Sequence, residues 1–312
     1  MLGYIASLLC MGAIYSIAAL GVNLQWGYTG LFNIGIAGWF AAGAYTSAIL
    51  TTGPGSHLGG FGLPFPVGLL GAAIVAGIFG WLIGLPTLRL RFGFFAIATI
   101  GLGRSMVLFF KNEQWLTSGV WGMGGIPKPL SNVFPANADW AYGFLVLAIM
   151  LILYYILEKI VSSPWGRLQL AIKEDEHLTE MLGKDVWHYR MQSLVLGSML
   201  VGIAGATYAH YQQYINPESF GDVMATFIIW VMVVAGGTGN NKGSIAGAFT
   251  IWLVWTLSEF GAGYLPLAST QVPYVRTLLV GLVIVGLLRW RPQGLIGRKR
   301  AVSAAAGEER VE

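Results

Sequence analysis

The feature that most constrains the fold of this chain is a long start without any charge. Between Met1 and Leu88 there is no Asp, Glu, Lys or Arg, and the first charged residue is Arg89. A helix that crosses the hydrocarbon core of a bilayer needs about 20 apolar residues, so this stretch is long enough for about three crossings. Glycine-rich segments at 27–30 and 51–62 mark the turns between them.

The composition of the whole chain agrees with a membrane protein. Charged residues make up 10% and hydrophobic residues 55% of the sequence, and the mean hydropathy is +0.66. A soluble domain has about a quarter of its residues charged, so a soluble enzyme, a disordered chain and a nucleic-acid-binding chain are excluded. The single Cys10 excludes a disulfide framework, and the four His residues lack the spacing of metal ligands.

We predict an all-α integral membrane protein with about nine spans. The apolar runs are continuous and lack the alternation of barrel strands, so helices are expected. Glycine turns between the runs leave room for broken or re-entrant helices. The expected spans lie near residues 2–25, 31–50, 64–86, 93–111, 140–160, 189–213, 222–238, 244–262 and 273–290. The transmembrane domain covers 1–296, and a C-terminal tail covers 297–312.

The basic residues predict the orientation of the chain, because Lys and Arg are retained on the cytoplasmic side. If the loop 158–190 is cytoplasmic, alternation of the spans places 14 of the 18 Lys and Arg residues inside. Only Lys111, Lys128 and Arg276 then lie outside, and Arg104 lies within a span. With an odd number of spans, the N-terminus is outside and the C-terminus is cytoplasmic.

Many glycines lie inside the spans. Gly80/Gly84 and Gly243/Gly247 are GxxxG pairs, which predict close helix packing. Two stretches also share a pattern, Thr-Gly followed by an apolar helix start, at 29–40 and 238–249. Such paired, Gly-interrupted segments are typical of translocation paths in transporters. Chance similarity is the alternative, because Gly, Ala, Ile and Phe are common in this chain.

The loop Ser162–Arg190 is the long polar stretch between spans. A helix is expected to begin at Pro164 and to end at Gly183. Its apolar residues fall near one helical face and its carboxylates mostly elsewhere. That apolar face requires cover by the protein's own spans, by lipid or by a partner. Lipid is the weakest of these, because four carboxylates would face a negatively charged leaflet.

The loop contains three short motifs: Gly166-Arg167, the run Ala171-Ile172-Lys173-Glu174-Asp175-Glu176, and Leu182-Gly183. Further motifs lie at 27–31, 43–45, 88–91, 95–99, 208–210, 214–220 and 236–239. In this order they resemble a known family, the M-type (LivM-like) permease subunits of ABC importers for branched-chain amino acids, in which the loop motifs belong to the coupling loop. The resemblance extends over roughly residues 12–294.

The resemblance implies partners and a place in the cell. Expected partners are a homologous second permease, two cytoplasmic ABC ATPases and a periplasmic solute-binding protein, in the inner membrane of a bacterium. ATP and Mg²⁺ are expected in the ATPases, because this chain has no phosphate-loop motif; its segment 239–244 has Gly and Lys in the wrong order. The ATPases are expected to bind the coupling loop at about 162–187, through Gly166, Arg167, Ala171, Ile172, Glu174, Asp175, Glu176, Leu182 and Gly183.

We predict a path for a small polar solute lined by Asn33, Phe95, Thr99, Arg104, Gly237 and Thr238. Hydrogen bonding within the bundle is the alternative fate of Asn33 and Thr99. Arg104 is the sharpest candidate, since a charge inside a membrane tends to face the bundle interior or a watery cavity. It is expected to pair with Glu259, to meet a carboxylate-bearing solute, or to extend to the membrane surface.

The sequence departs from the family at positions that bear on the solute. The family usually has Ser, His, Glu and Arg near positions where this chain has Asn33, Ile36, Arg104 and Leu108. Branched-chain amino acids, urea and short amides therefore all remain candidate solutes. An ion-coupled secondary transporter is the alternative function, because it could use the same Gly-interrupted helices. A passive channel fits poorly, since no ring of charge or filter motif is visible.

Overall fold

The fold is described from a computed structural model of the chain. The description covers residues 2–53, 60–90, 92–131, 133–221, 223–262, 271–291 and 293–297. The tail 298–312, predicted to be cytoplasmic, lies outside the described residues.

Helices account for nearly all of the regular structure. The elements are α1 (Leu2–Val22), η1 (Asn23–Tyr28), α2 (Ile36–Thr51), α3 (Phe65–Thr87), α4 (Phe92–Asn112), α5 (Gln114–Thr117), η2 (Gly119–Trp121), β1 (Met123–Gly124), η3 (Pro135–Asn137), α6 (Ala138–Ser162), α7 (Pro164–Glu174), α8 (Glu176–Met181), α9 (Val186–Gln212), β2 (Tyr214–Ile215), η4 (Pro217–Phe220), η5 (Val223–Phe227), α10 (Ile228–Gly236), α11 (Asn241–Ala262) and α12 (Val272–Trp290). The elements η1 and η5 are π-helical turns, and η2, η3 and η4 are 3-10 helices.

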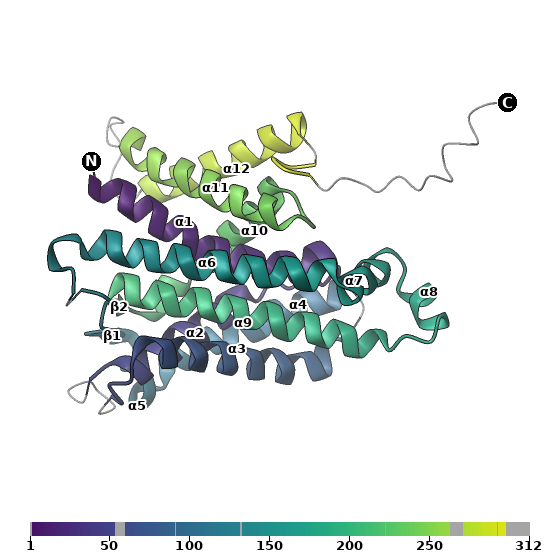
Figure 1. Ribbon diagram of the computed structural model, residues 1–312, viewed down its shortest axis with the longest axis horizontal. Helices are drawn as coiled ribbons and strands as arrows, with labels where there is room; N and C mark the ends of the chain where they lie inside the picture. The colour runs from purple at the N-terminus through teal and green to yellow at the C-terminus, as the bar shows by residue number, and fades with distance from the viewer. Residues whose placement is uncertain are drawn as a thin grey trace.

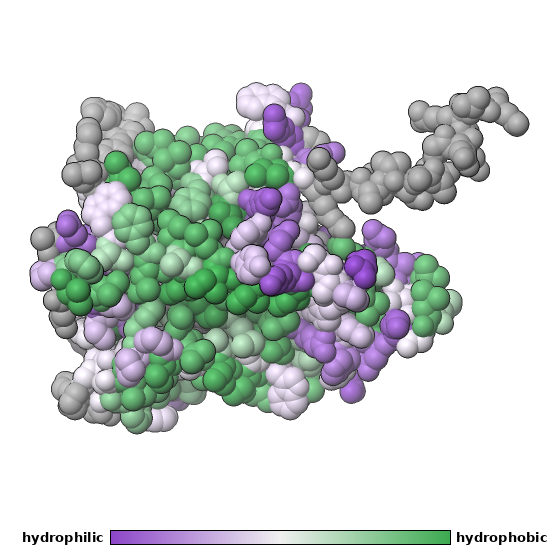
Figure 2. Space-filling view, viewed as in Figure 1, coloured by the Kyte–Doolittle hydropathy of each residue, from purple (hydrophilic) through white to green (hydrophobic). Residues whose placement is uncertain are grey.

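The long helices run side by side, and the short elements gather at the two ends of the molecule (Figure 1). One end holds the start of α1 together with α5, β1 and β2, and the other holds α7 and α8. Hydrophobic residues cover the middle of the face in Figure 2, and hydrophilic ones gather toward the end with α7 and α8. An apolar middle between polar ends is the pattern expected of a membrane protein.

The predicted helical class is confirmed, and each predicted span coincides with a helix. In the described part of the chain, five helices are long and apolar enough to cross a membrane, while α2 and the stretch 225–236 are shorter apolar helices. The exact number of crossings stays a prediction. In the most apolar stretch of each helix, 78% of the residues of α1 but only 17% of those of α6 are buried. Helix α1 therefore lies in the core, and α6 lies at the surface.

Glycine packing brings the core helices into backbone contact. A Cβ atom on Gly43 of α2 would lie 2.0 Å from the Gly202 carbonyl oxygen of α9, and one on Gly205 would lie 1.9 Å from that of Phe40. Both GxxxG pairs also pack, Gly84 against Met191 and Gly247 against the Met232 carbonyl. The prediction that the GxxxG glycines serve close packing is confirmed.

The helical structure is interrupted between α1 and α2. Helix α1 continues into η1, and an irregular segment at 29–35 precedes α2. A Cβ on Gly35 would lie 2.2 Å from the Thr99 carbonyl oxygen, and one on Gly103 would lie 2.5 Å from that of Gly35. These α4 residues are about 10 to 17 Å along a helix of about 31 Å. Helix α2 therefore begins near the middle of the bundle.

The loop 162–190 forms two helices, which corrects the expected single helix from Pro164 to Gly183. The backbone of Asp175 is extended (φ −152°, ψ 107°), and its side chain accepts a hydrogen bond from the Leu178 amide that begins α8. A capping Asp competes with helix continuation because it satisfies the free amides of a new helix start. Gly183, with φ +76°, follows the end of α8 as predicted.

Candidate functional site

A cavity of about 350 Å³ lies where α2 begins. Its lining comes from three parts of the chain: Phe32, Ile34, Gly35 and Ala37 at the start of α2, Ile100, Gly103 and Arg104 of α4, and Thr226, Phe227 and Trp230 of η5 and α10. Small-molecule sites are typically mostly apolar, with a few polar groups, and have volumes of about 300–1,000 Å³. The cavity therefore has the size and character of a site for one small solute.

Polar side chains hold the irregular segment in place behind this cavity. Thr99 accepts a hydrogen bond from the Ile34 amide at 3.2 Å, and Thr226 accepts one from the Ala37 amide at 3.2 Å. Asn33 accepts one from the Gly35 amide at 3.0 Å and donates one to Gln25 at 3.0 Å. These bonds satisfy the backbone groups that the break leaves free. Irregular backbone at membrane depth is tolerated only with such partners or beside a watery cavity.

Three residues predicted to line the path are buried and do not line this cavity. Asn33, Phe95 and Thr99 are at most 1% exposed, and none of them is among the cavity-lining residues. Phe95 packs with Leu31 and Leu88. Asn33 and Thr99 thus follow the alternative considered from the sequence, hydrogen bonding within the bundle.

Phe32 and Trp230, which line the cavity, form an aromatic cluster with Trp26. The ring of Phe32 lies 4.9 Å from that of Trp26 and 4.7 Å from that of Trp230. Trp230 also donates its Nε1 hydrogen to the Asn33 carbonyl oxygen at 3.1 Å. The cluster therefore connects η1 and α10 to the irregular segment. No motif in the sequence indicates that these aromatic residues act together.

Arg104 is the predicted path residue that does line the cavity, and its side chain is exposed on the surface of α4. The carboxylate that the structure places in its field is Glu218 of η4. The pKa of Glu218 is lowered, first by the hydrogen bond and charge of Lys111 and then by the charge of Arg104. The predicted pairing with Glu259 falls on a side chain outside the described residues.

Gly237 and Thr238 lie away from this cavity, in the turn between α10 and α11. Gly237 has φ 111°, and a Cβ there would lie 2.7 Å from the Ile296 carbonyl oxygen. Along α10, this turn is about 15 Å from Thr226. The structure therefore does not bring these two residues together with Arg104.

The predicted coupling loop has an inner and an outer face. Gly166 and Ile172 face inward, and a Cβ on Gly166 would lie 1.9 Å from the Val161 carbonyl oxygen. The other predicted coupling residues are exposed: Arg167, Ala171, Glu174, Asp175, Glu176, Leu182 and Gly183. The outer face also contains Leu178 and Met181, which are 56% and 83% exposed. The sequence analysis did not identify Met181, because this residue belongs to none of the motifs in the loop.

Lys173 fastens α7 to the broken helix. Its Nζ atom donates a hydrogen bond to the Gly27 carbonyl oxygen at 2.8 Å and lies 6.0 Å from the Trp26 ring. Beside it, a polar cavity of about 480 Å³ separates α8 from the turn at 88–90. An ion pair of 2.5 Å between Arg190 and Glu176 crosses this region. The coupling loop is therefore in direct contact with the segment that leads to the first cavity.

The sequence matches one family model over residues 4–288, described as branched-chain amino acid transport system / permease component. The chain belongs to this family. The resemblance found in the sequence is confirmed, and the chain is a multi-pass membrane permease subunit of the ABC importer type, not itself an enzyme.

Individual permeases agree with this placement. The high-affinity branched-chain amino acid permease protein LivM of Salmonella typhimurium is 29% identical over 93% of this chain and 69% of its own length. The probable LivM of Methanocaldococcus jannaschii is 26% identical over 96% of this chain and 95% of its own length. The LivH permease of Salmonella typhimurium is 24% identical over 92% of both chains. No solved structure matches the chain.

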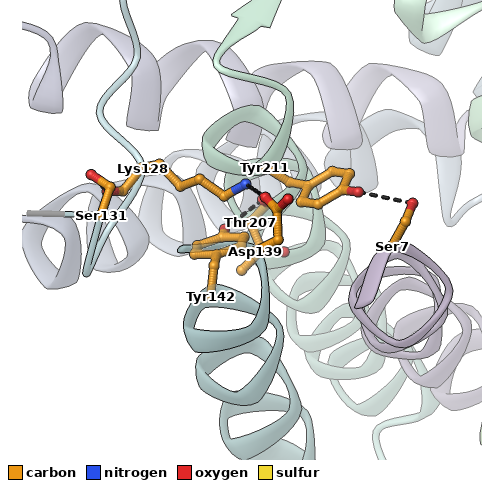
Figure 3. A network of polar contacts seen from close by, with 7 residues as sticks. All are labelled: Ser7, Lys128, Ser131, Asp139, Tyr142, Thr207 and Tyr211. Carbon is orange, nitrogen blue, oxygen red and sulfur yellow. Dashed lines mark hydrogen bonds and ion pairs between the residues drawn. The ribbon is translucent and has the colours of Figure 1, made fainter. Parts of the chain in front are cut away.

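A polar network braces the end of the permease opposite the coupling loop (Figure 3). Lys128, only 8% exposed, forms an ion pair with Asp139 at the start of α6 and lies 5.0 Å from the Tyr211 ring. Tyr211 donates a hydrogen bond to Ser7 of α1, and Tyr142 donates one to the Thr207 carbonyl oxygen. The loop around Lys128 is thereby bound to α6 and α9, and Tyr211 connects it to α1.

The paired strands β1 and β2 complete this end of the permease. The Tyr214 hydroxyl donates a hydrogen bond to the Trp121 carbonyl oxygen at 2.6 Å. Both aromatic side chains are exposed, Trp121 at 84%. A braced, aromatic surface of this kind offers a firm contact area, since large rigid side chains are enriched at protein interfaces.

Proposed function

We propose that this permease carries branched-chain amino acids across the bacterial inner membrane as one of two permease chains of a binding-protein-dependent ABC importer. A homologous second permease, two cytoplasmic ATPases and a periplasmic solute-binding protein complete the complex. The ATPases bind ATP and Mg²⁺. The N-terminus of the permease is outside, and its C-terminus is cytoplasmic.

The observation that carries the proposal is the exposed apolar face of α8 on a chain of this family. Leu178, Met181 and Leu182 are 56%, 83% and 73% exposed. They lie beyond the membrane-length helices, at the end that holds α7 and α8 (Figure 1). A cluster of exposed apolar side chains on a short helix outside the apolar band needs a protein partner. An ATPase that grips this face would move α7 and α8 together.

The cavity at the start of α2 supports the proposed solute class. Its wall includes Ile100 and Phe227, which suit an aliphatic side chain. Arg104 at the same cavity supplies the positive charge that a carboxylate-bearing solute would meet. The volume of the cavity, about 350 Å³, is large enough for one small molecule.

The contacts also support a route from the ATPases to the path. ATP binding would draw the ATPases together and displace α7. Lys173 would transmit that displacement to Gly27, and the cluster of Trp26, Phe32 and Trp230 would transmit it to the cavity wall. At the opposite end, the surface around Trp121 and Tyr214 is the proposed contact for the loaded binding protein.

The test is uptake by the complete complex in proteoliposomes. We expect leucine, isoleucine or valine to enter only with ATP and the binding protein. A Leu178→Ser/Met181→Ser variant should lose uptake and ATPase co-purification about tenfold or more, since a few apolar anchors dominate such contacts. The matched control is Val133→Ser/Phe134→Ser, which alters exposed apolar residues in the loop before α6 and should retain the ATPases.

Three results would contradict the proposal in different ways. Undiminished ATPase binding by the α8 variant would remove α8 as the coupling surface. Uptake driven by an ion gradient without the ATPases would indicate the ion-coupled secondary transporter. ATP-driven uptake of urea or an amide, but of no branched-chain amino acid, would leave the importer in place and reject the solute.

A further inference from the structure

The outward face of α4 places a glycine and an arginine between large apolar residues. Ile97, Gly101, Arg104 and Leu108 are all exposed and follow each other at spacings of four, three and four residues, which is one helical face. A Cβ on Gly101 would meet no atom within 4 Å. Gly101 is therefore not required by packing inside this chain, in contrast to the core glycines.

Helix α6 provides the comparison within the same molecule. Its exposed face carries Phe144, Leu151 and Ile152, which are 64%, 50% and 60% exposed. Large apolar side chains of this kind suit lipid. Small and polar residues instead suit contacts between helices, because they let two backbones approach and supply hydrogen bonds. The face of α6 therefore suits contact with lipid, and Gly101 and Arg104 on the face of α4 suit contact with another helix.

Arg104 makes lipid contact at the α4 face costly. It lies about 18 Å along a helix of about 31 Å, near the middle of the span. A charged group at this depth is stable only toward protein or water. The cavity opens beside it, with Phe32, Ile34 and Gly35 of the irregular segment in its wall. Irregular backbone at membrane depth likewise excludes contact with lipid.

We infer that the outward face of α4, formed by Ile97, Gly101 and Arg104, is the surface on which the second permease packs, so that the cavity is closed between the two chains. This inference rests on the proposed function, which supplies the second permease. The chain resembles both LivM and LivH permeases along almost its whole length. Two chains of one fold related by a two-fold axis present corresponding faces to each other, so the partner's equivalent helix is the expected contact.

Site-specific photo-cross-linking in the complete complex tests the contact. A photoreactive amino acid at Ile97 of α4 is compared with one at Ile152 of α6 and one at Leu282 of α12, which are 68%, 60% and 59% exposed. We expect Ile97 to yield the cross-link to the second permease, and Ile152 and Leu282 to yield lipid adducts. A permease cross-link from Ile152 or Leu282, with none from Ile97, overturns the inference.

A matched pair of glycine variants gives a second readout. Gly101 and Gly281 both lie in apolar helices, and a Cβ on either meets nothing within 4 Å. Gly101→Leu should reduce co-purification of the second permease about tenfold, and Gly281→Leu should leave it unchanged, because only the first is expected at the contact. Equal retention by both variants would count against α4 as the contact face.

The two experiments separate this inference from the proposed function. If the second permease and the ATPases co-purify with the wild-type chain but cross-link through α6 or α12, only the interface assignment fails. If no second permease co-purifies with the wild-type chain, the proposed function fails, and the interface fails with it.

Discussion

Gly205 shows at the scale of one residue how this bundle is held together. In lipid there is no hydrophobic driving force between helices, so close backbone packing must hold them. At Gly205 of α9, a Cβ atom would lie 1.9 Å from the Phe40 carbonyl oxygen of α2. The opposing atom belongs to the backbone and cannot rotate away. The two helices can be in contact only because this residue has no side chain.

We predict that Gly205→Ala destabilises the permease by about 1–3 kcal/mol, the usual cost of overpacking. The measurement is thermal unfolding of the purified chain in detergent, where the midpoint should fall. Gly281→Ala is the control, because open space surrounds that position. It should be neutral or slightly stabilising, by up to about 1 kcal/mol, since Ala favours helix over Gly. Equal midpoints for the two variants would contradict this account of the contact between α2 and α9.

At the scale of elements, the coupling loop differs most from its sequence prediction. A continuous amphipathic pattern predicted one helix, but Asp175 ends α7 and caps α8. Ile172, predicted to touch the ATPases, is 4% exposed, while Met181 is 83% exposed. The corner at Asp175 reorients the apolar face of α8 relative to that of α7. Helical periodicity assumes an unbroken axis, so it could not separate the two faces.

The hydrogen bond from Lys173 to the Gly27 carbonyl oxygen predicts that its loss uncouples ATP hydrolysis from solute uptake. Lys173→Met keeps the aliphatic stem but removes the donor to the Gly27 carbonyl, which is worth about 1 kcal/mol or more. ATPase binding and hydrolysis should persist, while solute carried per ATP hydrolysed falls about fivefold, the change expected for 1 kcal/mol. The measurement is the ratio of uptake to phosphate release in proteoliposomes.

Lys184→Met is the matched control for Lys173→Met, because Lys184 is exposed in the same loop. It should leave the ratio of uptake to phosphate release unchanged. A normal ratio for Lys173→Met would show that the contact between α7 and η1 does not transmit movement. Loss of ATPase binding instead would assign Lys173 to the docking surface.

At the scale of the whole molecule, the two ends of the bundle have different predicted environments. The positive-inside rule predicts that Met181 is cytoplasmic and that Trp121 is outside. These residues are 83% and 84% exposed and lie on elements at opposite ends of the molecule (Figure 1). The native Cys10 is buried. Single introduced cysteines at these positions can therefore report the orientation of the chain.

We expect Trp121→Cys to react with a membrane-impermeant thiol reagent in cells whose outer membrane has been opened and whose inner membrane is intact. Met181→Cys should react only after the inner membrane is opened. The physical reason is that the reagent cannot cross the bilayer and reaches only the outer end. The unmodified chain, with buried Cys10, gives the background. The reverse pattern of labelling would invert the proposed orientation.

The sequence by itself determined the class of this protein, the positions of its long apolar helices and its family. Long charge-free runs can be stable only in lipid, and such runs must be helical because lipid offers no partner for free backbone groups. The pattern also predicted a turn at residues 27–30, because glycines interrupt the apolar runs there, and the structure has the end of η1 and the start of the irregular segment at this place. It singled out Arg104, since a charge in a span is costly wherever it lies.

Only the tertiary structure decided which residues meet at the cavity. Gly35, Arg104 and Thr226 line one cavity although they are far apart in the chain, and Asn33 lies buried behind it. In a soluble helix, polarity separates the inner face from the outer one. In a membrane bundle both faces are apolar, so helix neighbours are selected by shape and backbone contact. Those contacts exist only between folded elements, and therefore the sequence pattern could not specify them.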